Sequence, residues 1–138
     1  MSALSDRMNA IKSTLATMYP ARTVTRDLKD FAARPLSELQ EGIYTVLSAS
    51  EGNYSHYLGG MTRDGEHRVL LVGQIAVTET AEPSATEDAE GTMIDEIKAF
   101  TRALPPELGS LTLTGWRQSQ QLEHPYGWVA FDMTLREG

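Results

Sequence analysis

The sequence has no cysteine among its 138 residues. This excludes disulfide bonds and metal sites built on thiolates. It also lacks an apolar run long enough for a signal peptide or a membrane span. We therefore expect an intracellular protein that contacts no membrane. At this length a single domain covering residues 1–138 is expected, and folding would bury about two thirds of the unfolded surface.

Motifs that would support an enzymatic activity are missing as well. The chain has no phosphate-binding glycine loop, nucleophile elbow, zinc-protease histidine pair or EF-hand pattern. Asp64, Glu66 and His67 could contact a cation, but a short charged turn is usually solvated. Glu123 and His124 could form an acid–base pair, although adjacent residues on an extended chain point apart. We expect no enzymatic activity, no metal site and no cofactor.

Basic residues are absent from residues 79–96, which carry seven of the nineteen acidic residues in the chain. Such a patch repels phosphate backbones and argues against a protein whose main task is to grip DNA. It is either a solvated helix face or an acidic surface that lines a channel for DNA or meets a basic partner. The candidate residues for this surface are Glu87, Asp88, Glu90 and Asp95.

Two segments have the apolar periodicity of amphipathic helices. The first covers residues 3–19, with Ser5 or Asp6 available as a cap and Pro20 after its end. The second begins near Ser84, where Glu87 completes a capping-box pattern. Its predicted packing face consists of Met93, Ile94, Ile97, Phe100 and Leu104.

Four or five segments favour β-strands because they are rich in β-branched and aromatic residues or alternate in polarity. Residues 30–39 between them predict irregular structure or one helical turn. We expect an α+β fold with a mainly antiparallel sheet and two helices packed on it. Gly73 predicts a bulge or the close approach of another backbone. The expected strands are residues 22–28 at an edge, 42–50, 68–78, 110–122 and 128–136, the last with Val129, Phe131, Met133 and Leu135 facing the core.

Residues 51–67 are rich in glycine and combine turn chemistry with exposed aromatic residues. Such a segment is typical of an extended hairpin or a long functional loop. We expect it to be a mobile or assembly loop, in which Tyr54 and Tyr57 could contact another subunit.

A polar run near the C-terminus is the second candidate contact surface. The two tryptophans, Trp116 and Trp128, could either complete the core or anchor a contact. The polar residues after Trp116 are typical of a solvated sheet edge or of a subunit interface, where an uncovered strand pairs with a neighbour. The candidate interface residues are Trp116, Arg117, Gln118, Gln120 and Tyr126, together with Tyr54 and Tyr57.

The order of these elements resembles the tail terminator proteins of long-tailed bacteriophages or a related neck or tail-completion protein. The resemblance is carried by residues 68–78, by residues 84–104, and by residues 113–116 with 128–133. It implies a structural subunit that forms a hexameric ring on the tail tube, stops tube polymerisation and contributes to head–tail joining. The implied partners are further copies of the chain, the tail tube protein and a head-completion protein, with DNA only passing through the channel. The implied location is the virion tail, or the host cytoplasm during assembly.

Two other classes of function remain open. A soluble binding module would use the sheet for a peptide or a small molecule, and it would be a monomer or dimer with a concave apolar pocket. A small enzyme would bring together residues such as Asp64, His67, Glu123 and His124.

Overall fold

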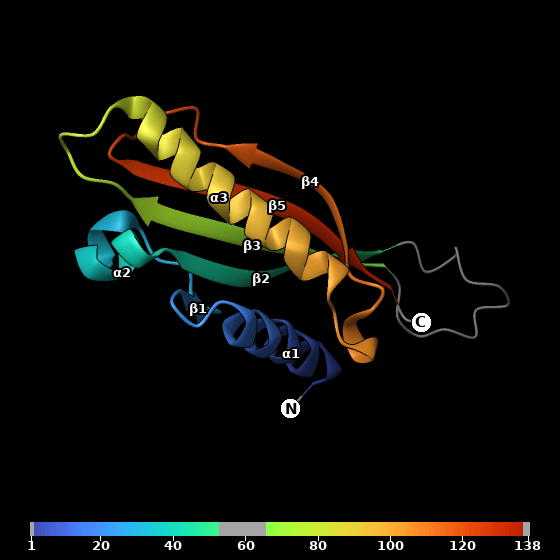
Figure 1. Cartoon of the computed structure of the whole chain (residues 1–138). Coiled ribbons are helices and arrows are strands. Elements are labelled where there is room, and N and C mark those ends of the chain that lie inside the picture. The colour runs from blue at the N-terminus through green and yellow to red at the C-terminus, as the bar shows by residue number, and fades with distance from the viewer. Residues whose placement is uncertain (1, 53–65, 137–138) are drawn as a thin grey trace, which may run out of the picture.

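The structure, a computed structural model, describes residues 2–52 and 66–136. It confirms the α+β class, with a five-stranded sheet in the order β1-β2-β3-β5-β4 (Figure 1). All neighbouring strands are antiparallel except the pair of β1 and β2, which is parallel. The elements in chain order are α1 (Ala3–Met18), β1 (Thr23–Thr25), the 3-10 turn η1 (Phe31–Ala33), α2 (Leu36–Glu41), β2 (Ile43–Gly52), β3 (Glu66–Ala76), α3 (Pro83–Arg102), the 3-10 turn η4 (Pro106–Leu108), β4 (Thr112–Gln118) and β5 (Tyr126–Leu135).

Helices α1 and α3 cover one face of the sheet, which we call the covered face (Figure 1). Its core is built by alternation along the strands, since every second side chain of a strand points to the same side. The predicted inward set of the last strand, Val129, Phe131, Met133 and Leu135, is fully buried there. The packing face of α3 is also confirmed, because Met93, Ile94, Ile97 and Phe100 are buried in the same cluster and Leu104 packs against it.

Among the described residues, the opposite side of the sheet, which we call the open face, is covered only at one end. There Leu39 of α2 forms a small cluster with Ile43 and Ala76, and Phe31 and Tyr126 pack against it. The rings of Phe31 and Tyr126 are stacked with their centroids 5.0 Å apart. Further along this face, side chains such as those of Leu70 and Val72 are only half-buried.

The predicted helix caps are wrong for both long helices. Helix α1 begins at Ala3 as expected, but its cap is Ser2 and not Ser5 or Asp6, because the hydroxyl of Ser2 accepts the Ser5 backbone N–H at 3.0 Å. Helix α3 follows Glu82, which makes no side-chain capping bond, and it has a proline at its first position. Pro83 has the backbone angle that a first helical turn requires, so Ser84 lies inside the helix and cannot cap it.

The predicted strand 110–122 is too long at both ends. Strand β4 stops at Gln118 because Gln120 and Gln121 have φ angles of 61° and 65°. Such left-handed backbone conformations reverse the chain direction and end the pairing with β5.

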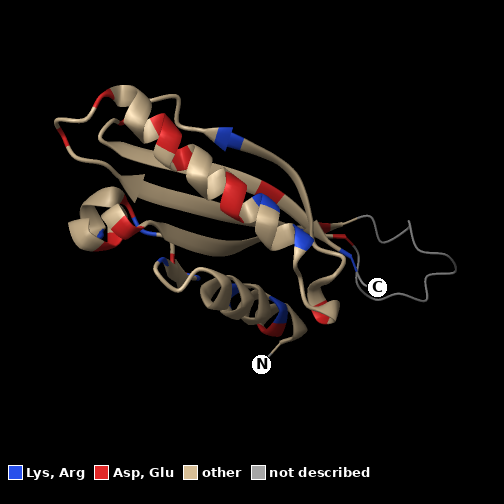
Figure 2. Ribbon diagram, in the orientation of Figure 1, with Lys and Arg blue, Asp and Glu red and all other residues tan. Residues whose placement is uncertain are grey.

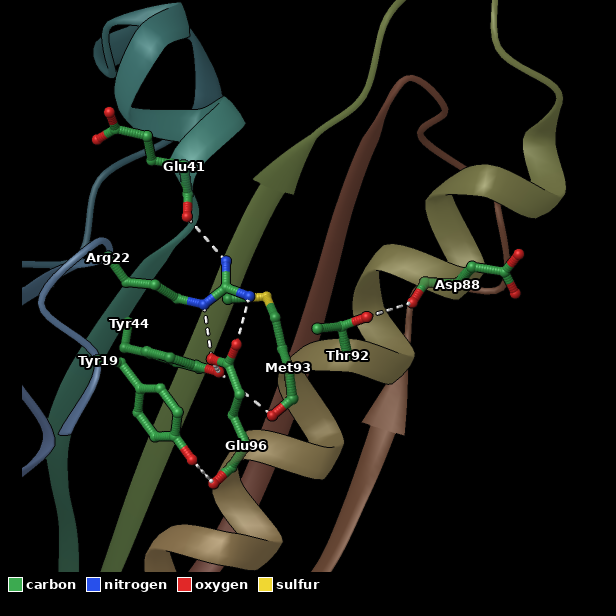
Figure 3. A network of polar contacts seen from close by, with 8 residues as sticks. All are labelled: Tyr19, Arg22, Glu41, Tyr44, Asp88, Thr92, Met93 and Glu96. Carbon is green, nitrogen blue, oxygen red and sulfur yellow. Dashed lines mark hydrogen bonds and ion pairs between the residues drawn. The ribbon is translucent and has the colours of Figure 1, made fainter.

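A polar network joins α3 to the side of the sheet formed by β1 and β2 (Figure 3). The Arg22 guanidinium donates to both oxygens of Glu96, from Nε at 2.6 Å and from Nη2 at 2.8 Å. The Tyr44 hydroxyl donates to Glu96 Oε1 at 2.8 Å, and the Tyr19 hydroxyl donates to the Glu96 carbonyl at 2.8 Å. Because the Arg22 and Glu96 side chains are only 12% and 19% exposed, the ion pair is largely shielded from screening by solvent.

Removing the Tyr44 hydroxyl tests this network through the pH dependence of stability. Burial, followed by the Glu96 carboxylate, holds the pKa of Tyr44 well above its usual range. The phenol stays neutral in the folded protein, whereas the unfolded chain loses this proton above about pH 10. The free energy of unfolding should therefore fall as the pH rises past about 10, because the unfolded state then binds fewer protons.

We expect Tyr44→Phe to reduce stability by about 1 kcal/mol at neutral pH and to make the alkaline decline shallower. Urea unfolding at a series of pH values measures both effects. An unchanged alkaline slope in the variant would show that Tyr44 is not responsible for the decline.

Two glycines of the sheet give α3 the space it needs. A Cβ atom at Gly73 would lie 3.0 Å from Met93 Cε, so the close approach predicted at Gly73 comes from a helix side chain and not from a backbone. A Cβ atom at Gly127 would lie 2.5 Å from Glu90 Oε2 and 2.7 Å from Thr86 Cγ2. Both neighbours of Gly127 are fully buried and have little room to move.

We expect Gly127→Ala to destabilise the protein by about 1–3 kcal/mol because the added methyl group overlaps α3. Gly115→Ala, in the neighbouring strand, is the matched control. A Cβ atom at Gly115 would have nothing within 4 Å, so the effect of this substitution should stay below about 0.5 kcal/mol. Chemical denaturation of both variants decides the point, and equal effects would refute the close packing at Gly127.

Candidate assembly surface

In the described part of the chain, strand β4 forms one outer edge of the sheet and pairs only with β5. Exposed side chains follow it along both faces, among them Thr112, Thr114 and Arg117. The opposite edge is the three-residue strand β1, which is far shorter. A long uncovered edge is a ready template for another chain.

Trp116 projects from this edge and is 40% exposed, so it does not complete the core. Its pairing with Phe131 places it on the covered face, beside α3. There the Lys98 ammonium nitrogen lies 4.6 Å from the centre of the indole ring. This cation–π contact holds the ring against the helix while leaving much of its surface accessible.

Arg117 and two residues of the following turn extend the exposed surface. Arg117 pairs with Ala130, so it lies on the open face, and its guanidinium has no hydrogen bond or ion pair with any described residue. Gln120 is exposed, and Leu122 is 81% exposed. A hollow of about 520 Å³ lies between Trp116, Arg117, Leu122 and Trp128. We call Trp116, Arg117, Gln120 and Leu122 the edge patch.

Two other candidate interface residues are engaged within the subunit. The Gln118 side chain donates to Glu90 Oε1 at 3.3 Å and faces α3. Tyr126 is half-buried and stacked on Phe31. Tyr54 and Tyr57 lie outside the described residues. Sequence reasoning did not single out Leu122, because it placed this residue at the end of the predicted strand 110–122 and not in a turn.

The acidic surface predicted on the second helix is present for three of its four residues. Glu87, Asp88 and Asp95 are exposed on α3, where Figure 2 shows acidic residues along the outer side of the helix. Together with Gly91 and Thr92 they line a shallow hollow of about 430 Å³. We call these three acids the acidic helix face.

Glu90 does not belong to this surface, and its assignment there was wrong. Its position on α3 turns it toward the sheet, and its side chain is fully buried. Its Oε2 accepts the Trp128 backbone N–H at 3.0 Å and the hydroxyl of Ser119. Gln118 donates to Oε1. A carboxylate held by several donors in the interior ties α3 to β4 and β5.

The residues considered for catalysis do not form one site, because each makes a different structural contact. Glu123 accepts the indole N–H of Trp128 at 3.0 Å, whereas His124 Nδ1 lies 2.7 Å from the hydroxyl of Thr86. His67 lies within β3 and not in a loop, and its Nε2 is 2.9 Å from Ser48 Oγ. Asp64 lies outside the described residues. Within residues 2–52 and 66–136, no three His, Asp or Glu side chains are grouped so that they could hold a metal ion.

The sequence matches no protein-family model, and no curated protein is significantly similar to it. In the described part of the chain, no helix has both the length and the apolar character needed to cross a bilayer.

Glu90→Gln tests whether the buried carboxylate holds the edge strand in place. We expect the variant to lose about 2 kcal/mol of stability, because an amide offers fewer acceptors to the donors around it and adds an N–H group without a partner. The control is Glu87→Gln on the exposed side of the same helix, which should change stability by less than about 0.5 kcal/mol. Thermal unfolding of the two variants provides the comparison, and similar melting temperatures would contradict this role of Glu90.

Proposed function

We propose that this chain is a structural subunit that assembles into a ring of identical copies and acts as a tail terminator, or a related tail-completion protein, of a long-tailed phage or prophage. The observation that carries the proposal is the edge patch. An exposed tryptophan and an exposed arginine lie on the edge strand β4, and an almost fully exposed leucine lies in the turn that follows it. Tryptophan and arginine are the residues most often found as anchors at subunit interfaces.

A contact between the edge patch and a different surface of the next copy would allow a closed ring. When the edge patch of one copy meets a different surface of the next, the contact is heterologous, and repeating it generates a ring if the rotation closes. The surface on the neighbour would receive the indole of Trp116 and the guanidinium of Arg117. In this proposal the ring would sit on the tail tube, stop its polymerisation and later meet a head-completion protein.

The acidic helix face supports a channel that DNA passes through without binding. Residues 83–97 of α3 include the exposed Glu87, Asp88 and Asp95 and no Lys or Arg, and the first basic residue of the helix is Lys98, three positions after Asp95. A wall of one negative sign repels the phosphate backbone and keeps the DNA from adhering. The acidic helix face and the edge patch adjoin each other, since Gln121 Nε2 of the turn after β4 lies 3.3 Å from Glu87 Oε1.

A binding module that is a monomer or a dimer is the second candidate function. It is favoured by a depression of about 440 Å³ on the open face of the sheet. The two candidates differ in mass, because a ring subunit self-associates through the edge patch and a binding module does not.

Self-association tests the ring proposal. We expect light scattering over a wide concentration range to reveal hexamers at high concentration, and negative-stain images to contain rings. Trp116→Ala should weaken association about tenfold or more, because a central aromatic anchor contributes about 2 kcal/mol. Leu36→Ala is the matched control, since Leu36 is 56% exposed on α2, away from β4.

A wild-type protein that stays monomeric at every concentration would contradict spontaneous ring formation and favour the binding module. Rings that form equally well in Trp116→Ala would place the interface elsewhere on the subunit.

A further inference from the structure

The depression on the open face is lined by both polar and aromatic residues. It lies between η1 and the start of β5, with strand β3 at its base. Two aromatic rings face it, and two carboxylates stand at its exposed rim. Its lining includes Asp30, Phe31, Val72, Gln74, Glu123 and Trp128.

Gln74 at the base of this depression carries an acceptor without a donor. The side chain is only 5% exposed, and its Nε2 donates to the Lys29 carbonyl at 3.0 Å. Its Oε1 has no hydrogen-bond partner among the described residues. Buried polar atoms are nearly always paired, so an unpaired amide oxygen at a depression marks a place where a donor from outside is missing.

The rim adds two carboxylates that no cation of the described chain neutralises. Asp30 precedes η1 but makes no capping bond with its side chain. Glu123 uses Oε1 to accept the Trp128 indole N–H at 3.0 Å. Arg26 and Arg34 are each four residues from Asp30. Arg26 donates to Asn9 Oδ1 at 3.1 Å and Arg34 to the Asp27 carbonyl at 2.6 Å, and no ion pair joins either arginine to Asp30 or Glu123. The lining therefore offers acceptors and negative charge beside aromatic surface.

We propose that this depression binds a guanidinium group, presented as the arginine side chain of a partner protein. A guanidinium is planar and cationic, stacks on aromatic faces and carries five N–H donors and no acceptor. These properties match the rings of Phe31 and Trp128, the two rim carboxylates and the unpaired oxygen of Gln74. An ammonium group has the charge but lacks the flat surface for stacking and the fork of donors.

The negative rim favours an arginine within a polypeptide over the free amino acid. Free arginine carries an α-carboxylate, which Asp30 and Glu123 would repel at close range. An arginine in a chain has a neutral amide on either side. The proposed site does not depend on the ring, because it uses the open face and not the edge patch.

The test is a titration of the isotope-labelled, full-length protein with Nα-acetylarginine amide, which imitates an arginine in a chain. The indole N–H resonance of Trp128 is followed by NMR and is assigned with the variant Trp116→Phe. We expect a saturable shift of this resonance, because the ring of Trp128 lines the depression. The matched ligand control is Nα-acetylcitrulline amide, which has almost the same shape without the charge.

Variants of the rim make the test specific. We expect Asp30→Asn and Glu123→Gln each to weaken binding about fivefold, and the double variant to weaken it more than about tenfold. Both residues are exposed, and the substitutions keep their shape, so the fold should be retained. Asp88→Asn, which removes the same charge on the covered side of the molecule, should leave the affinity unchanged.

The proposal is overturned if Trp128 shows no saturable shift at millimolar ligand, or if the citrulline analogue produces the same shift. Equal weakening by Asp88→Asn would also overturn it, since binding would then follow net charge alone. Tighter binding of free arginine than of the capped form would overturn the assignment of a protein partner. A failure of the ring proposal appears in the mass measurement and leaves this titration unaffected.

Discussion

The position of helix α3 is the constraint on which the rest of the structure depends. Glu90 and Glu96 attach the helix on opposite sides, the first to β4 and β5 and the second to Arg22 and Tyr44. Each glutamate is surrounded by donors, so moving the helix would leave a charge without partners in the interior. The glycine at position 127 provides the space that lets Glu90 reach the β5 backbone.

This attachment also determines what the protein exposes. With one end of α3 held against β4, Trp116 is left at the margin of the covered face, where Lys98 supports it. The outward side of the same helix carries the acids that remain in solvent (Figure 2). The edge patch and the acidic helix face therefore both depend on how α3 packs against β4 and β5. A change at Glu90 should disturb both surfaces.

The sheet divides the molecule into faces with different chemistry. The covered face is an apolar core with the hydrogen-bonded carboxylates of Glu90 and Glu96 at its margins. The open face has an orphaned amide oxygen at Gln74, carboxylates at Asp30 and Glu123, and the rings of Phe31 and Trp128. This face therefore has more hydrogen-bond acceptors than donors. The proposed ligand, a guanidinium group, supplies donors and positive charge.

The sequence alone determined the α+β class, the two long helices and the inward side of β5, because periodic burial is a local property that a pattern of apolar residues records. It also placed acidic residues on one helix, but it could not separate Glu90 from Glu87, Asp88 and Asp95. That distinction needs the direction in which α3 faces the sheet. Only the tertiary structure decided that Glu90 is buried, that Trp116 lies at an edge and that the Gln74 oxygen has no donor among the described residues, since each depends on contacts between residues far apart in the chain.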